Sequence, residues 1–338
     1  MSKIFAQQEP VLFLAPMQEV CSLEFWDVLT SLGGPDFFVT EYFRVHRDSR
    51  LKKKLLRNIT ENKTGRGIVA QILGEHIPSL LRTAKELQEF PIVGIDLNLG
   101  CPAPGVCRKG VGGGLLKKPE RLRDILMALR ENISCDFTVK TRLGYEKPEE
   151  FEKFLPIFAE SKIDALILHA RTVRSMYNGA VDYSWIARAV REVSFPVVAN
   201  GNIVSPEIAQ QVLKNTGARG LMMGRGAIRN PWLFFQTREF LKTGAYTPVK
   251  LKQVLHYVHQ LYEKLRVPTL RSAQHVAMMK KYMNFIAQGV SEGDEFLKKI
   301  RKVSTEKDFF ILCDDYLNNE QIFTTAIVAL SNSGNPRI

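Results

Sequence analysis

Residues 92–102 read Ile-Val-Gly-Ile-Asp-Leu-Asn-Leu-Gly-Cys-Pro, and this stretch decides the fold class. Its first half, Ile92–Leu97, is short, apolar and β-branched, which predicts a buried strand of a parallel sheet. Gly100 allows the chain to turn, and Pro102 keeps Cys101 out of a following helix. We therefore expect a thiol at the carboxyl end of a strand, where α/β enzymes hold their reactive groups. A buried, inert cysteine is the alternative.

Apolar strand-like runs alternate with amphipathic helical stretches between residues 11 and 223. This alternation predicts an α/β fold, the (β/α)8 TIM barrel. A doubly wound open sheet is the alternative, but no Gly-x-Gly-x-x-Gly motif follows the first strand. The predicted strands are Val11–Ala15, Phe37–Thr40, Ile68–Leu73, Ile92–Leu97, Phe137–Thr141, Ala165–His169, Pro196–Asn200 and Gly220–Met223. The predicted helices are Leu23–Leu32, Pro78–Phe90, Pro119–Asn132, Pro148–Ser161, Tyr183–Val193 and Pro206–Asn215.

Length, composition and cysteine content limit the class of protein. With 338 residues, 45% of them hydrophobic, the chain can build one large domain and a smaller one. Its five cysteines are odd in number and lack paired zinc-ligand spacing, so we expect no metal site. Because we find neither a signal-peptide pattern nor an apolar run of about 18 residues, we expect a cytoplasmic protein without a membrane segment.

The chain is basic, and part of its charge is concentrated. A formal net charge of +12 favours a polyanionic partner such as nucleic acid. From Arg44 to Arg66 nine Lys or Arg residues face only two acids, Asp48 and Glu61. We expect this basic stretch to contact phosphate groups, and a merely solvated basic surface is the alternative.

The strand pattern stops after Lys242, and helical patterns follow it. We expect a barrel domain over residues 1–243 and a small all-α domain over residues 247–338 that binds RNA. The predicted helices of this second domain are Leu251–Leu265, Arg271–Ile286, Gly293–Thr305 and a last one near Glu320–Ser331.

Polar residues follow nearly every predicted strand, at the barrel end that carries function. Asn200-Gly201-Asn202 and Gly224-Arg225-Gly226 follow the seventh and eighth strands, where barrels commonly bind phosphate. Lys140 is a fixed cation suited to a developing anion, and the Gln71 amide suits a heterocycle edge. A phosphorylated planar cofactor fits these groups, and flavin mononucleotide (FMN) is the natural candidate.

Taken in order, these residues resemble the tRNA-dihydrouridine synthase family. The resemblance runs across residues 11–230, and the helical tail matches the family's second domain more loosely. The matching segments are Leu14–Met17, Thr40–Glu41, Gln71–Gly74, Asp96–Pro102, Val139–Gly144, His169–Thr172, Asn200–Ile203 and Met223–Gly226. The chain departs from the family pattern at Pro104–Cys107 and at Gly114, which concerns the conformation of this loop more than the chemistry.

The resemblance implies roles for individual residues. Cys101 resembles the general acid that gives a proton to carbon 5 of uracil after hydride reaches carbon 6. Asn98 resembles the residue that holds the target uracil, and Arg142, Arg171 and Tyr177 are candidates for the nucleotide side of the pocket. The implied FMN contacts are Pro16, Met17, Gln71, Lys140, His169, Asn200, Gly201, Asn202, Gly224 and Arg225.

The resemblance also implies NADPH as reductant and tRNA as substrate, with the uracil extruded into the pocket. We expect a monomer. One alternative is a flavin barrel acting on a free small molecule, such as a dihydroorotate-type dehydrogenase or an ene-reductase, which leaves the basic stretch unexplained. A second is a barrel that binds RNA without catalysis, which would hold no flavin.

Overall fold

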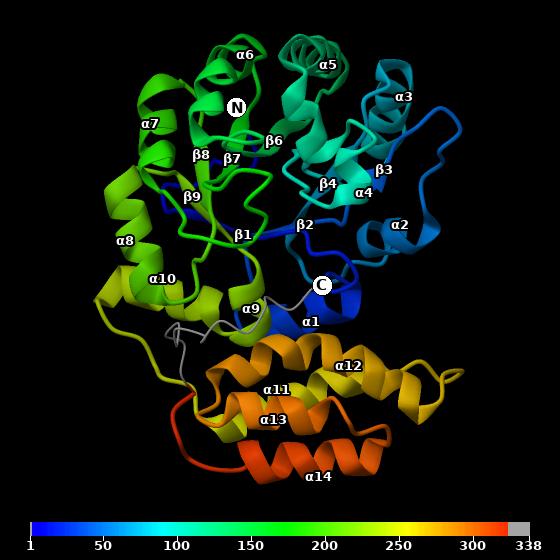
Figure 1. Cartoon of the computed structure of the whole chain (residues 1–338), viewed down its shortest axis with the longest axis vertical. Coiled ribbons are helices and arrows are strands. Elements are labelled where there is room, and N and C mark those ends of the chain that lie inside the picture. Colours follow the sequence, from blue (N-terminus) through cyan, green and yellow to red (C-terminus); the bar gives the residue numbers. More distant parts are fainter. Residues whose placement is uncertain (1, 324–338) are drawn as a thin grey trace. The chain divides into compact units, whose positions relative to one another are not determined.

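The computed structural model describes residues 2–323, and its sheet confirms the predicted barrel (Figure 1). Eight parallel strands follow the order β2-β1-β9-β8-β7-β6-β5-β4, and β2 pairs with β4 to close the ring. A further strand, β3, pairs with the end of β4 beyond the β2 contact. The strands are β1 Val11–Leu14, β2 Phe37–Val39, β3 Phe43–Arg44, β4 Gly67–Leu73, β5 Gly94–Leu99, β6 Asp136–Arg142, β7 Ala165–His169, β8 Val197–Asn200 and β9 Gly220–Met223.

Alternate residues of these strands fill the barrel interior, because successive side chains of a strand point to opposite faces. The buried members of this core are Ile4, Val11, Phe13, Ala15, Val39, Val69, Ile167, Val198 and Met222. Gln71, His169 and Asn200 lie two residues beyond core members of β4, β7 and β8. They therefore face the same interior, one layer nearer the carboxyl ends of the strands.

Helices surround the strands of the barrel (Figure 1). Proline stands in the first turn of several of them, where its missing N–H leaves no bond unmade. The helices here are α2 Lys53–Thr60, α3 Ile77–Gln88, α4 Pro104–Cys107, α5 Pro119–Asn132, α6 Leu155–Glu160, α7 Ser184–Glu192 and α8 Pro206–Thr216, with 3-10 helices η1 Gly112–Lys117 and η2 Pro148–Lys153.

Most predicted elements differ from the observed ones by one or two residues at their ends, and two of the differences affect the site or the continuity of a helix. The strand predicted over Ile92–Leu97 is Gly94–Leu99, because Ile92 is held in a turn by a bond from its N–H to the Phe90 carbonyl. Asn98 is therefore inside the strand. The helix predicted over Pro148–Ser161 is broken into η2 and α6. Pro156 cannot donate the N–H that an unbroken helix would require at that point.

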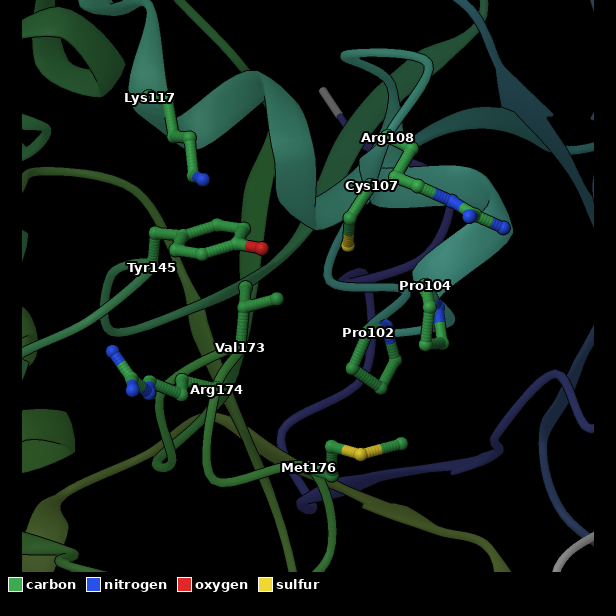
Figure 2. A pocket seen from close by; sticks show the side chains of 9 residues that line it. All are labelled: Pro102, Pro104, Cys107, Arg108, Lys117, Tyr145, Val173, Arg174 and Met176. Carbon is green, nitrogen blue, oxygen red and sulfur yellow. The ribbon is translucent and has the colours of Figure 1, made fainter.

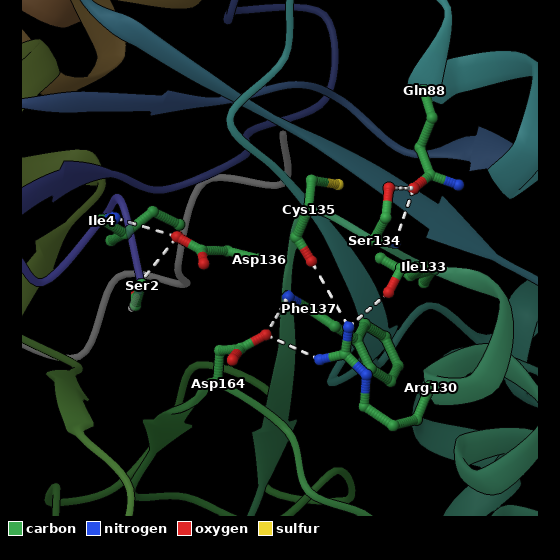
Figure 3. A network of polar contacts seen from close by, with 10 residues as sticks. All are labelled: Ser2, Ile4, Gln88, Arg130, Ile133, Ser134, Cys135, Asp136, Phe137 and Asp164. Carbon is green, nitrogen blue, oxygen red and sulfur yellow. Dashed lines mark hydrogen bonds and ion pairs between the residues drawn. The ribbon is translucent and has the colours of Figure 1, made fainter.

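A polar network closes the barrel at the amino-terminal end of its strands (Figure 3). Asp136 accepts hydrogen bonds from the Ser2 hydroxyl and the Ile4 N–H, both at 2.9 Å, which ties the start of the chain to β6. Asp164 accepts from the Phe137 N–H and from Arg130, both at 2.7 Å. These bonds hold the end of the barrel opposite the predicted chemistry.

The chain forms two compact units, and the barrel strands all belong to the first. The second unit contains Met17–Pro35, Val204–Gln210 and the chain from Gly224 onward. Within it, the Tyr282 hydroxyl donates to the Val20 carbonyl at 3.0 Å, and the Tyr257 hydroxyl donates to the Ile228 carbonyl at 3.2 Å. Its helices are α1 Leu23–Ser31, α9 Arg225–Arg229, α10 Leu233–Thr243, α11 Leu251–Lys264, α12 Ser272–Ile286, α13 Gly293–Ile300 and α14 Glu306–Leu317, with 3-10 helix η3 Ala287–Gly289.

The carboxyl-terminal helices follow the prediction in part. The helix predicted over Gly293–Thr305 ends at Ile300, and α14 after it was not predicted. The helix predicted near Glu320–Ser331 lies outside the described residues from position 324, and Ile322 forms an antiparallel bridge with Lys250. Across residues 2–323, no helix is both long and apolar enough to cross a bilayer.

Candidate active site

The Asn98 side chain shapes the turn that carries Cys101. Asn98 stands near the end of β5, and its Oδ1 accepts hydrogen bonds from the N–H groups of Gly100 at 3.1 Å and Cys101 at 2.9 Å. An amide oxygen that takes two successive backbone N–H groups fixes a tight turn. Cys101 is thus held two residues past the strand, half-buried.

A buried chain of hydrogen bonds fixes the orientation of the Asn98 amide. Asp96 is fully buried and accepts from the Thr138 hydroxyl at 2.7 Å and from Gln71 Nε2 at 2.8 Å. Since Gln71 donates to this carboxylate, its Oε1 is the atom that accepts from Asn98 Nδ2, at 2.8 Å. The Asn98 oxygen is then left to accept from the Cys101 turn. One buried carboxylate therefore sets the direction of both amides.

Lys140 supplies a cation beside the hydrogen bonds that join Asp96, Gln71 and Asn98. It pairs with Asn98 in the register of β5 and β6, and its Nζ donates to Asn200 Oδ1 at 3.0 Å. Burial and the guanidinium of Arg142 lower the pKa of Lys140 to about 8, and the nearby Asp96 carboxylate opposes this fall. Burial raises the pKa of Asp96 to about 7. The two charges stabilise each other.

The Cys101 thiol is in its protonated form at neutral pH. Burial raises its pKa above the ordinary value, although an Ala103 N–H bond and the charges of Arg142 and Lys140 act in the other direction. The Tyr42 hydroxyl forms a side-chain hydrogen bond with Cys101. A protonated thiol beside a hydroxyl and two cations can release a proton and stabilise the thiolate that remains.

Both predicted substrate arginines are buried, and both donate hydrogen bonds to backbone carbonyls. Arg142 donates to the carbonyls of Gly100 at 2.9 Å, Thr172 at 2.8 Å and Met176 at 2.5 Å. It thereby joins the Cys101 turn to the loop after β7. Its guanidinium also lies 5.5 Å from the centre of the exposed Tyr177 ring.

Arg171 acts similarly in the loop after β7. It donates to the Gly179 carbonyl at 2.7 Å and contacts His169 Nε2 at 3.3 Å, so that nitrogen is the acceptor. It also donates to Asn202 Oδ1 at 3.4 Å. Arg171 therefore links two predicted flavin contacts that follow different strands.

The turn after β8 requires glycine. Gly201 has φ +122°, and a Cβ there would lie 2.9 Å from His169 Cδ2. The Tyr183 hydroxyl donates to the Gly201 carbonyl at 2.6 Å, and Asn202 has φ +47°. The backbone after β8 is thus held in a conformation that β-carbon-bearing residues rarely adopt.

The first compact unit brings together most of the predicted site. At the carboxyl ends of its strands lie Gln71, Asn98, Cys101, Lys140, Arg142, His169, Arg171 and Asn200, followed by Gly201 and Asn202. Pro16 ends the first segment of this unit, two residues past β1, and Tyr177 lies in the loop after β7. Met17, Gly224 and Arg225 belong to the second unit, and α9 begins at Arg225. Among residues 2–323, His, Cys, Asp and Glu side chains nowhere gather into a group that could hold a metal ion.

Three residues of this network, Asp96, Thr138 and Tyr42, were not predicted to have a role in the site. Asp96 and Thr138 were detectable, because each stands two residues before a predicted site residue and so shares its strand face. Tyr42 gave no such signal. It lies between β2 and β3, where the strand is interrupted, and its side chain reaches Cys101 from there.

Comparisons with known proteins show which family this chain belongs to. The family model described as dihydrouridine synthase (Dus) matches residues 13–323. A Neisseria meningitidis serogroup A protein named tRNA-dihydrouridine(16) synthase is 29% identical over 88% of this chain and 92% of its own length. A Helicobacter pylori protein named probable tRNA-dihydrouridine synthase is 31% identical over 92% of this chain and 93% of its length. A Pseudomonas putida protein named tRNA-dihydrouridine synthase B is 36% identical over 70% of each chain.

Among solved structures, a 2-naphthoyl-CoA reductase complex aligns with a TM-score of 0.51 at 13% identity. The alignment covers 68% of this chain and spans half of the length of that reductase, and at this identity it supports the barrel fold alone. The family match, in contrast, includes nearly every residue described above. This chain therefore belongs to the dihydrouridine synthase family.

Proposed function

We propose that this protein is a tRNA-dihydrouridine synthase that reduces the 5,6 double bond of uridines in tRNA, with FMN as cofactor and NADPH as reductant. The observation that carries the proposal is the Cys101 thiol. In a chain of this family, it is fixed by Asn98 at the carboxyl end of a barrel strand, where burial raises its pKa and so favours the protonated thiol. A proton donor in this place is what the reduction of a carbon–carbon double bond requires.

The residues at the barrel mouth fit a flavin phosphate ester. The Gln71 amide, the Lys140 ammonium and the His169 ring face the interior, and Gly201 keeps a space that a β-carbon would fill. Such donors suit a planar ring with carbonyl and anionic groups. We assign Pro16, Met17, Gln71, Lys140, His169, Asn200, Gly201, Asn202, Gly224 and Arg225 to FMN. When bound, this cofactor supplies hydride to carbon 6 of the uracil.

The protein's own groups bind the uracil and supply the proton. Asn98 uses its oxygen on the Cys101 turn and one N–H on Gln71, so its second N–H is available to a carbonyl of the base. The Cys101 S–H bond breaks as its proton moves to carbon 5, and the thiolate remains beside Tyr42 and Lys140. Solvent then restores the thiol. Arg142, Arg171 and Tyr177 we assign to the nucleotide side of the pocket.

The basic stretch and the helices over residues 247–338 we assign to tRNA. The loop before α2 is well fixed, since Arg82 donates to the carbonyls of Arg47 at 3.0 Å and Ser49 at 2.8 Å. Fixed cations hold phosphates without ordering a loop on binding, and the backbone contacts allow a base to be extruded.

The test is a spectrum followed by an assay. The purified protein should show flavin absorbance, or gain it when FMN is added. With NADPH it should then form dihydrouridine in undermodified tRNA, detected by nucleoside mass spectrometry, faster than with NADH. A protein that binds no flavin refutes the proposal. Equal turnover of free uridine would favour a small-molecule reductase instead.

A further inference from the structure

A cavity of about 290 Å³ opens at the carboxyl ends of the strands of the first unit. Its walls come from the loops after β5, β6 and β7, and Figure 2 shows the Tyr145 hydroxyl and the Cys107 sulfur turned toward its middle. It is lined by none of the residues assigned above to FMN or uracil. The space is at the small end of ligand sites, which matches one base better than a large cofactor.

The lining combines an aromatic and apolar floor with cations. Tyr145, Val173 and Pro102 provide ring and hydrocarbon surface, and the Lys117 ammonium lies 3.6 Å from the Tyr145 ring centre. Arg108 and Lys117 form no ion pair with any residue in the described range 2–323. Arg174 pairs with Glu146, so its charge is neutralised. The side chains that line the cavity therefore carry a net positive charge beside aromatic and apolar surface.

We propose that this cavity binds a nucleotide of the RNA substrate that neighbours the target uridine, its base against Tyr145 and its phosphate near Lys117 and Arg108. The inference rests on the proposed function. An extruded uracil leaves its neighbours unstacked, and single-stranded bases are bound by aromatic side chains beside cations. The lining meets both needs with groups that the uracil site does not use.

The wall of this cavity is in direct contact with the turn that carries the proton donor, Cys101. Cys107 Sγ donates to the Cys101 carbonyl at 3.5 Å, and Pro102 directly follows Cys101 in the wall. Arg142 holds the opposite side, because it donates to the Met176 carbonyl as well as to Gly100. A base in the cavity therefore contacts the same short turn that positions the thiol.

Kinetics with tRNA provide the first test. Tyr145→Ala should raise the KM for undermodified tRNA about tenfold, from the loss of one stacked base, and Tyr145→Phe should restore it. Lys117→Ala should reduce the salt dependence of tRNA binding by about one unit in the log–log slope. Lys118→Ala is the matched control, because this neighbouring lysine pairs with Glu75 outside the cavity. Its effect on the slope should be smaller.

The second test needs no turnover and uses the wild-type protein. Undermodified tRNA should protect Cys107 from alkylation, read by peptide mass spectrometry. Cys135 should not be protected, since it is similarly half-buried but lies at the start of β6, at the other end of the barrel (Figure 3). NADPH should protect neither.

Three results would overturn the inference while leaving the proposed function intact. The first is dihydrouridine formation with an unchanged KM for tRNA in Tyr145→Ala. The second is alkylation of Cys107 at the same rate with and without tRNA. The third is protection of Cys107 by NADPH in the wild-type protein together with a raised KM for NADPH in Tyr145→Ala. That result would show that the cavity binds the reductant. Wild-type protein that forms no dihydrouridine would instead refute the proposed function.

Discussion

Asp96 should be the most sensitive position in the buried layer beneath the active site, and two substitutions separate its roles. Asp96→Ala leaves Gln71 Nε2 and the Thr138 hydroxyl without their acceptor at a fully buried position. An unpaired buried donor costs about 1–3 kcal/mol, so the pair would cost about 2–6 kcal/mol. Burial of the Asp96 carboxylate is itself unfavourable, as its pKa of about 7 indicates. Removing the carboxylate recovers this cost and offsets part of the loss. We therefore expect a net loss near the lower end, about 2–3 kcal/mol.

Asp96→Asn keeps an oxygen for Gln71, and the Thr138 hydroxyl can rotate to accept from the new amide. We expect this variant to lose less than about 1 kcal/mol. Urea unfolding followed by tryptophan fluorescence measures the difference between the variants. The Ala variant should also reduce turnover of tRNA more than the Asn variant, because the Gln71 and Asn98 amides lose their fixed orientation. Equal unfolding midpoints and equal turnover in the two variants would refute this reasoning.

Three further predictions follow from the charges and backbone of the site. Because the pKa of Lys140 is lowered to about 8, turnover should fall as pH rises through that value, and Lys140→Arg, which stays charged, should move this fall to higher pH in a pH–rate profile. Gly201→Ala should weaken FMN retention in a fluorescence titration, because φ +122° and the 2.9 Å approach to His169 exclude a β-carbon; full retention would contradict this. Replacing Lys52, Lys53 and Lys54 by Ala should lower the salt slope of tRNA binding by about two to three units, and an unchanged slope would place the RNA interface elsewhere.

The barrel was predictable from the sequence because its strands are short apolar runs that end in polar residues. The predictions failed where an element is not marked by such an apolar run. β3 is only two residues long, and α2 lies in the lysine-rich stretch, where charge hid its buried face. The start of α14, in contrast, does have a signal in the sequence, because Thr305 caps the helix by accepting a hydrogen bond from the Asp308 N–H.

Within the candidate site, the position of a residue along its strand was easier to predict than the orientation of its side chain. Cys101, Asn98 and Lys140 stand where the motif placed them, at neighbouring strand ends. The sequence did not show that Arg142 donates hydrogen bonds to three backbone carbonyls, one in the loop after β5 and two in the loop after β7. Nor did it show that Tyr42 reaches the thiol. Such contacts depend on how loops from distant segments meet, which strand periodicity does not encode.

The proton donated by Cys101 is the central claim, and one comparison tests it most directly. Wild-type protein and Cys101→Ala, both loaded with FMN, are given NADPH and undermodified tRNA, and dihydrouridine is measured by mass spectrometry over time. We expect Cys101→Ala to keep its flavin absorbance and its affinity for tRNA, while product formation falls at least about 100-fold. Dihydrouridine formed by Cys101→Ala at the wild-type rate would contradict it.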